Sequence, residues 1–137
     1  MSATHTVPDN APSTLPTLVS AWFEIPVLDF ERARRFYEAL LGVQLREERM
    51  GPSHMAIFPS TTCASGGCLC AMEGYAPSTQ GSVVYLTTSN DVQQHLDRAV
   101  ALGGAVLWPR TELPEGMGVY AQIRDCEGNR VGLYSRV

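Results

Sequence analysis

The fold is decided by two stretches of sequence, residues 29–42 (DFERARRFYEALLG) and residues 90–103 (NDVQQHLDRAVALG). In each stretch apolar residues recur every three or four positions, which is typical of a helix that covers a core with one face. Asp29 can cap the first helix, and Asn90 or Asp91 the second. Gly42 and Gly103 can end them. The sequence therefore predicts two amphipathic helices.

Each predicted helix is preceded by one apolar strand and followed by three. The predicted strands are residues 19–27, 43–49, 53–59 and 67–73, and then 81–88, 105–109, 118–124 and 130–136. The same order thus occurs twice, with an offset of 90 − 29 = 61 residues. This repeat predicts an α+β fold of two paired βαβββ modules, residues 18–75 and 80–137, in a single domain spanning residues 18–137. Residues 1–17, rich in Pro, Ser and Thr, are predicted to be a disordered tail.

Composition narrows the classes of partner. The formal net charge is −4, and only two basic residues, Arg34 and Arg35, are adjacent. A nucleic-acid surface needs clustered positive charge, so we expect no nucleic-acid partner. No apolar run reaches the ~18 residues of a membrane span, and the start lacks a secretory signal, so we expect no membrane contact and a cytoplasmic location. In that compartment the four cysteines, Cys63, Cys68, Cys70 and Cys126, should be free thiols.

Two motifs carry a resemblance to a known family. Residues 29–42 resemble the first-helix signature of the vicinal oxygen chelate superfamily, the glyoxalase/bleomycin-resistance/dioxygenase proteins. Residues 125–133 (DCEGNRVGL) resemble its closing D-x-x-G-N turn and last strand. The resemblance implies a concave, half-barrel-like mixed sheet with the helices outside, a cleft, and a homodimer.

The enzymes of this family hold a divalent metal ion with His, Glu or Gln from the first and last strand of each module. Carried over residue by residue, these positions fall on Trp22, on Val84 or Val83, on Gly132, and on Cys70 or Cys68. An indole, an isopropyl group and a glycine do not coordinate such ions, and one cysteine cannot hold a metal alone. The resemblance therefore implies a member with no metal site, and we expect no cofactor.

Strand alternation assigns side chains to the face opposite the helices. If Phe23 and Ile25 face the helices, Trp22 and Glu24 face the cleft. The same argument applied to the other strands predicts a cleft with aromatic walls and a few polar groups, the mixture that suits a small organic ligand. The predicted ligand-binding residues are Trp22, Glu24, His54, Phe58, Cys70, Val84, Tyr120, Gln122, Gly132 and Tyr134. Five of them, Trp22, Glu24, Tyr120, Gln122 and Tyr134, are expected to line one cavity over Gly132.

Each candidate also has a structural interpretation. Trp22 can fill the volume of the lost metal, Glu24 can pair with Arg124 or Arg130, His54 can be exposed, and Cys70 can be a packing residue. The leading hypothesis is a metal-independent binder of small organic molecules. The alternatives are a lyase or isomerase with Glu24 as its catalytic base, a conventional glyoxalase I or extradiol dioxygenase, which the missing metal ligands disfavour, and an interaction module with a vestigial cleft.

Overall fold

The helices begin and end where the capping residues predict. In the computed structural model, which describes residues 20–60 and 66–136, α1 spans Phe30–Leu41 and α2 spans Val92–Ala101. The Asp29 carboxylate accepts a hydrogen bond from the Arg32 N–H at 3.1 Å, and Gly42 ends α1 with a φ of 69°. Asp91, rather than Asn90, caps α2 by accepting from the Gln93 N–H at 2.8 Å. Both helix predictions are confirmed, whereas the predicted tail, residues 1–17, lies outside the described residues.

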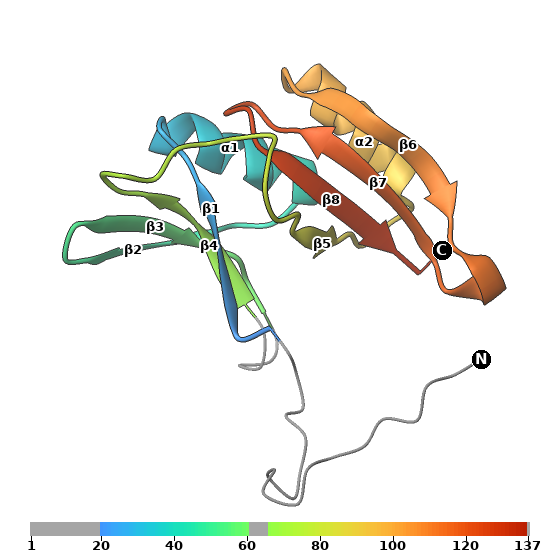
Figure 1. The fold of residues 1–137 in the computed structure, drawn as a ribbon, viewed down its shortest axis with the longest axis horizontal. Helices are drawn as coiled ribbons and strands as arrows, with labels where there is room; N and C mark the ends of the chain where they lie inside the picture. Colours follow the sequence, from blue (N-terminus) through green and yellow to red (C-terminus); the bar gives the residue numbers. More distant parts are fainter. Residues whose placement is uncertain (1–19, 61–65, 137) are drawn as a thin grey trace, which may run out of the picture.

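Within the described residues, eight strands form two sheets of the same design (Figure 1). The first has the order β1-β4-β3-β2 and the second β5-β8-β7-β6; β1 with β4 and β5 with β8 are parallel pairs, and the other pairs are antiparallel. This is the predicted α+β fold of two βαβββ modules. The strands of the first sheet are β1 (Trp22–Pro26), β2 (Arg46–Met50), β3 (Ser53–Ile57) and β4 (Gly66–Ala71). Those of the second are β5 (Tyr85–Thr87), β6 (Ala105–Glu112), β7 (Val119–Arg124) and β8 (Arg130–Ser135).

The strands differ in their bounds from the prediction, most of all in β1, β5 and β6. β1 covers Trp22–Pro26 instead of residues 19–27. β5 covers three residues instead of the eight in 81–88, because the stretch before Tyr85 belongs to the connection between the modules. β6 runs on to Glu112 instead of ending at residue 109, with register shifts against β7 that accommodate Pro109.

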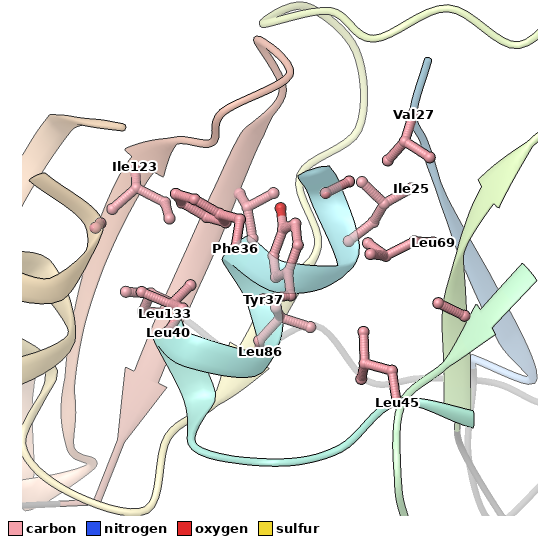
Figure 2. Packing of buried hydrophobic residues seen from close by; sticks show 14 of the residues in the cluster. Ile25, Val27, Phe36, Tyr37, Leu40, Leu45, Leu69, Leu86, Ile123 and Leu133 are labelled. Atoms are coloured by element: carbon pink, nitrogen blue, oxygen red, sulfur yellow. The ribbon is translucent and has the colours of Figure 1, made fainter. Parts of the chain in front are cut away.

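The core lies around α1 and joins the two modules. Figure 2 shows Ile123 and Leu133 approaching α1 from one sheet, and Ile25, Val27 and Leu69 approaching it from the other. Ala33, Tyr37 and Leu40 of α1 are fully buried between them. The helix-facing sides of both sheets thus belong to one hydrophobic cluster, and the opposite sides are left for a site. Neither helix of the described residues is long and apolar enough to cross a bilayer.

The closing turn of the second module is hydrogen-bonded to the first helix of the first module. The buried Asp125 accepts from the Tyr37 hydroxyl at 2.6 Å, and Asn129 Nδ2 donates to the Pro26 carbonyl at 2.7 Å. The buried Glu127 carboxylate accepts from the N–H groups of Leu28 and Asp29 and from Arg32. The two motifs that carry the family resemblance are therefore in direct contact, and this contact fixes how the modules pack.

Candidate functional site

The first sheet presents β1 and β4 side chains on the face opposite the core. Phe23 and Ile25 pack in the main hydrophobic cluster, so Trp22 and Glu24 point the other way, as alternation predicts. Trp22 is 47% exposed. Glu24 lies opposite Cys68 in the parallel pair, and Cys68 and Cys70 form a small separate cluster with Met55. This face is therefore partly aromatic and partly sulfur-rich.

The predicted facing of β3 is wrong. Ala56 is fully buried in the main core, and Phe58 packs against it with Phe23 and Tyr37. The His54 ring stacks on Phe30 with centroids 3.6 Å apart, and its Nε2 contacts Glu47 at 2.5 Å. Met55 and Ile57 take the opposite face instead. His54 and Phe58 thus face α1 rather than the predicted cleft, because the register with β4 pairs Ala56 with Leu69.

Glu24 forms a partnership that the sequence did not reveal. The Tyr75 hydroxyl donates to Glu24 Oε1 at 2.6 Å, from the loop that follows β4. This hydrogen bond, with the nearby negative charge, raises the pKa of Tyr75. The expected pairing with Arg124 or Arg130 does not occur, since Arg130 bonds to Gln122 and to the Thr79 carbonyl. A role for Glu24 as a catalytic base remains a prediction that the geometry does not test.

The described cysteines are poor nucleophiles. Burial raises the pKa of Cys68 to about 12 and that of Cys126 to about 11, and it also raises the pKa of Cys70. All three are free thiols, whereas Cys63 lies outside the described residues. Because the thiolate is the reactive form, packing describes Cys70 better than covalent catalysis does.

The second sheet presents a tyrosine face. Val119, Ala121, Ile123, Val131 and Leu133 are buried in the core, so Tyr120, Gln122 and Tyr134 point away from it, as predicted. Val84, however, packs against the core, and Tyr85 takes the outward position on β5. The prediction places Val84 at the same distance from its helix cap as Trp22 is from Asp29, 29 − 22 = 7 residues. In the structure the outward residue of β5 is one residue closer to its cap, 91 − 85 = 6. The predicted cleft position Val84 is thus corrected to Tyr85.

Gly132 does not leave open space. It lies opposite Tyr85 in the parallel pair, and a Cβ added at Gly132 would overlap the Tyr85 ring. The ring therefore covers the backbone of β8 at this point. Tyr85 in turn meets Tyr120 edge to face, with centroids 6.1 Å apart and planes at 68°. These rings, with Leu113 and Tyr134, line a hollow of about 380 Å³.

The predicted ligand-binding residues do not share one hollow within the chain. Tyr120 and Tyr134 line the hollow just described, Trp22 lines one of about 400 Å³ beside Gln44 and Gly66, and Glu24 lines a groove of about 190 Å³. The prediction of a single cavity containing all of them is wrong for one chain. The error came from assuming that the two outer faces meet within the chain, whereas it is the core faces of the two sheets that share one cluster around α1.

The donor set does not fit a divalent metal. The four positions at which the resemblance places metal ligands hold Trp22, Tyr85, Gly132 and the cysteine pair of β4. Within residues 20–60 and 66–136, no three His, Cys, Asp or Glu side chains are grouped so that they could hold an ion. No step through a metal is therefore derived for this site.

Comparison with known proteins agrees with this architecture. The sequence profile of the Glyoxalase/Bleomycin resistance protein/Dioxygenase superfamily matches residues 20–133. A glyoxalase/bleomycin resistance protein from Streptomyces sp. CB03234 is 25% identical, with a TM-score of 0.64 over 84% of this chain and 98% of that one. TnmS3, an antibiotic binding protein from the same organism, is 20% identical, with a TM-score of 0.62 over 89% of this chain and 98% of that one.

A mutant of glyoxalase I from Zea mays is 22% identical, with a TM-score of 0.60 over 85% of this chain. The chain spans less than half of the maize protein, 45% of its length, so that enzyme shares only the fold of one part. No curated protein sequence matches the chain. The profile match covers most of the described residues, and the duplicated βαβββ architecture agrees with it. The chain therefore belongs to the Glyoxalase/Bleomycin resistance protein/Dioxygenase superfamily.

Proposed function

We propose that this protein binds small organic molecules without a divalent metal ion. The observation that carries the proposal is the tyrosine face of the second sheet, where Tyr85, Tyr120 and Tyr134 with Leu113 line a hollow of about 380 Å³. Aromatic walls with a few polar groups are typical of ligand sites. At the metal positions of the family, a tyrosine ring covers a glycine, an arrangement that supports binding by stacking rather than by coordination.

We also propose that two copies of the chain complete the site. Trp22 and Tyr85 are large aromatic residues on the outer faces of the two sheets, and they are 47% and 45% exposed. If the first sheet of one copy covers the second sheet of another, the predicted residues that lie apart within one chain can line the same cleft. The two aromatic side chains would then be buried, which favours association.

Two similarities support this function without establishing it. TnmS3 is an antibiotic binding protein, and the related Streptomyces protein is named for glyoxalase and bleomycin resistance. We therefore expect a natural ligand of the size and aromatic character of a secondary metabolite rather than a small hydrophilic substrate. A lyase or isomerase that uses Glu24 remains the alternative, and substrate turnover that Glu24→Gln abolishes would establish it.

The decisive experiment measures binding with and without metal. Native mass spectrometry of freshly purified protein should detect a co-purified organic molecule, and calorimetry should measure its affinity before and after dialysis against EDTA. We expect the same affinity in both states. Loss of binding in EDTA, restored by Mn²⁺ or Zn²⁺, would contradict the proposal.

A further inference from the structure

A chain of hydrogen bonds on the second sheet can run in only one direction. Arg130 Nη1 donates to Gln122 Oε1 at 2.7 Å, and Gln122 Nε2 donates to the Tyr85 hydroxyl oxygen at 2.7 Å. A guanidinium has donors and no acceptor, so the oxygen of the Gln122 amide must face Arg130. The nitrogen of that amide must then face Tyr85. The Thr79 carbonyl accepts from Arg130 Nε at 3.3 Å and helps to hold the Arg130 side chain in place.

The last member of this series of hydrogen bonds, the Tyr85 hydroxyl, has a proton that no described residue accepts. Tyr85 accepts from Gln122, so its own hydroxyl proton is not used in that bond, and no acceptor for it occurs among residues 20–60 and 66–136. The Tyr134 hydroxyl differs, because it already donates to the Met117 carbonyl at 2.6 Å. Tyr85 therefore lines the aromatic hollow and carries an O–H group whose proton no described residue accepts.

The guanidinium of Arg130 strengthens the Tyr85 hydroxyl as a donor, although the two groups touch only through Gln122. The N–H of the Arg130 guanidinium polarises the Gln122 amide, whose N–H in turn polarises the Tyr85 hydroxyl. A phenol hydroxyl that already accepts such a hydrogen bond binds an acceptor oxygen better than a phenol without that partner, and it binds an anionic oxygen best. A ligand that carries only donors, such as an alkylammonium group, cannot use this proton.

We infer that the hollow selects flat aromatic ligands that carry an acceptor oxygen, a ketone or quinone carbonyl or a carboxylate, placed against the Tyr85 hydroxyl. This inference rests on the proposed function and names the ligand class of the same site. The rings of Tyr85, Tyr120 and Tyr134 contact the flat part of the ligand, and the O–H of Tyr85 fixes its orientation. The chain Arg130–Gln122–Tyr85 therefore determines selectivity.

The test uses four naphthalene probes of similar size with the full-length protein and calorimetry. They are 2-ethylnaphthalene, 2-acetylnaphthalene, 2-naphthoate and 2-naphthylmethylammonium. We expect the acetyl probe to bind about 5- to 10-fold more tightly than the ethyl probe, the gain expected for one net hydrogen bond. The naphthoate should bind at least as tightly as the acetyl probe, and the ammonium most weakly.

Two variants test the direction of the chain. Tyr85→Phe keeps the ring and removes the hydroxyl, so the ratio of acetyl to ethyl affinity should fall to about one. Gln122→Glu keeps the size of the side chain but replaces the amide donor with a carboxylate that accepts from both Arg130 and Tyr85. The Tyr85 proton then points inward, so the acetyl advantage should disappear and the ammonium probe should become favoured. Tyr75→Phe is the matched comparison, because it also removes one tyrosine hydroxyl, but that hydroxyl donates to Glu24 of the first module and lies outside the hollow, so the ratio should not change.

The outcomes separate this inference from the proposed function. Equal binding of the acetyl and ethyl probes to the natural protein, or an unchanged ratio in Tyr85→Phe, would overturn the inference while leaving an aromatic binding site. Failure of all four probes to bind below about 1 mM would overturn both. The comparison of probes on the natural protein needs no variant, so a poorly folding variant does not remove the test.

Discussion

Glu127 is the side chain whose removal should most clearly weaken the contact between the two modules and lower the stability of the protein. Its buried carboxylate accepts from the N–H groups of Leu28 and Asp29, at the start of α1, and from Arg32. A hydrogen bond to a charged group contributes about 1.5–3 kcal/mol to the stability of the folded protein, and this contribution is lost when the charged group is removed. Taking the lower value for each of the two backbone N–H groups, we expect Glu127→Ala to lower the free energy of unfolding by about 3 kcal/mol. Arg32 adds little, because its side chain is 53% exposed and solvent screens the pair.

The assay is urea denaturation followed by far-ultraviolet circular dichroism, with thermal unfolding beside it. For a domain of this size a loss of about 3 kcal/mol corresponds to a fall in Tm on the order of 10 °C. Glu31→Ala is the matched control, because Glu31 lies in the first turn of the same helix but is 60% exposed. The Glu31→Ala variant should lower the free energy of unfolding by less than about 0.5 kcal/mol. Equal losses for the two variants would refute the argument that Glu127 joins the modules.

The pH dependence gives an independent check on the same residue. Burial raises the pKa of Glu127, but the hydrogen bonds from Arg32, Asp29 and Leu28 outweigh it and leave that pKa below its ordinary value. A carboxyl whose pKa is lower in the folded state stabilises the fold fully above its unfolded pKa. That contribution is lost as the pH falls through the folded value. The gap in stability between the natural protein and Glu127→Gln should therefore be full at pH 7 and shrink below about pH 4.5.

Three further predictions concern the site and the assembly. Gly132→Ala should destabilise the protein by about 1–3 kcal/mol, because the added Cβ overlaps the Tyr85 ring, and most of this loss should vanish in a Tyr85→Ala background. Thiol titration should count four cysteines in denatured protein, but the native protein at pH 8 should react slowly at Cys68 and Cys126, whose pKa values burial raises to about 12 and about 11. Sedimentation equilibrium at about ten micromolar should give twice the mass of the chain, and a purely monomeric protein would count against the proposed two-copy site.

The helices and the order of the strands were predictable because their signals are local. Asp29 and Gly42 lie at the ends of an apolar stripe, and the structure uses both as caps. The second unit repeats the pattern, so each helix supports the assignment of the other. The short β5 was not predictable in the same way. Residues 81–88 have strand composition, but only Tyr85–Thr87 has the ladder partner that makes them a strand.

The hydrogen bonds between modules were also beyond local reasoning. The sequence marks the closing turn at residues 125–129, yet nothing in it says that Glu127 binds the start of α1, 98 residues earlier. Tyr75 gave no signal either, because it lies in a connecting loop whose path depends on the packing of both sheets. Such contacts depend on the tertiary arrangement rather than on any pattern in the chain.

Two errors in the site, the facing of β3 and that of Val84, have one physical origin, which also explains why they left the fold unaffected. Side chains in a strand alternate between faces with a period of two, so a shift of one residue exchanges the faces. At the end of β3 and just after it, the run Met55-Ala56-Ile57-Phe58 is apolar at every position, and the pairing of Ala56 with Leu69, rather than composition, decides which residues face the core.

The second module shows the same effect of a one-residue shift, here between a valine and a tyrosine. Val84 and Tyr85 both suit a strand, and a connection one residue shorter places the tyrosine outside and the valine against the core. Burial of either set of side chains stabilises the sheet, so the fold does not depend on the choice. The ligand does depend on it, because Tyr85 supplies both an aromatic wall of the hollow and the hydroxyl that Gln122 and Arg130 orient. A site built on strands is therefore determined by register, which a single sequence specifies less firmly than it specifies the helices that cover the sheet.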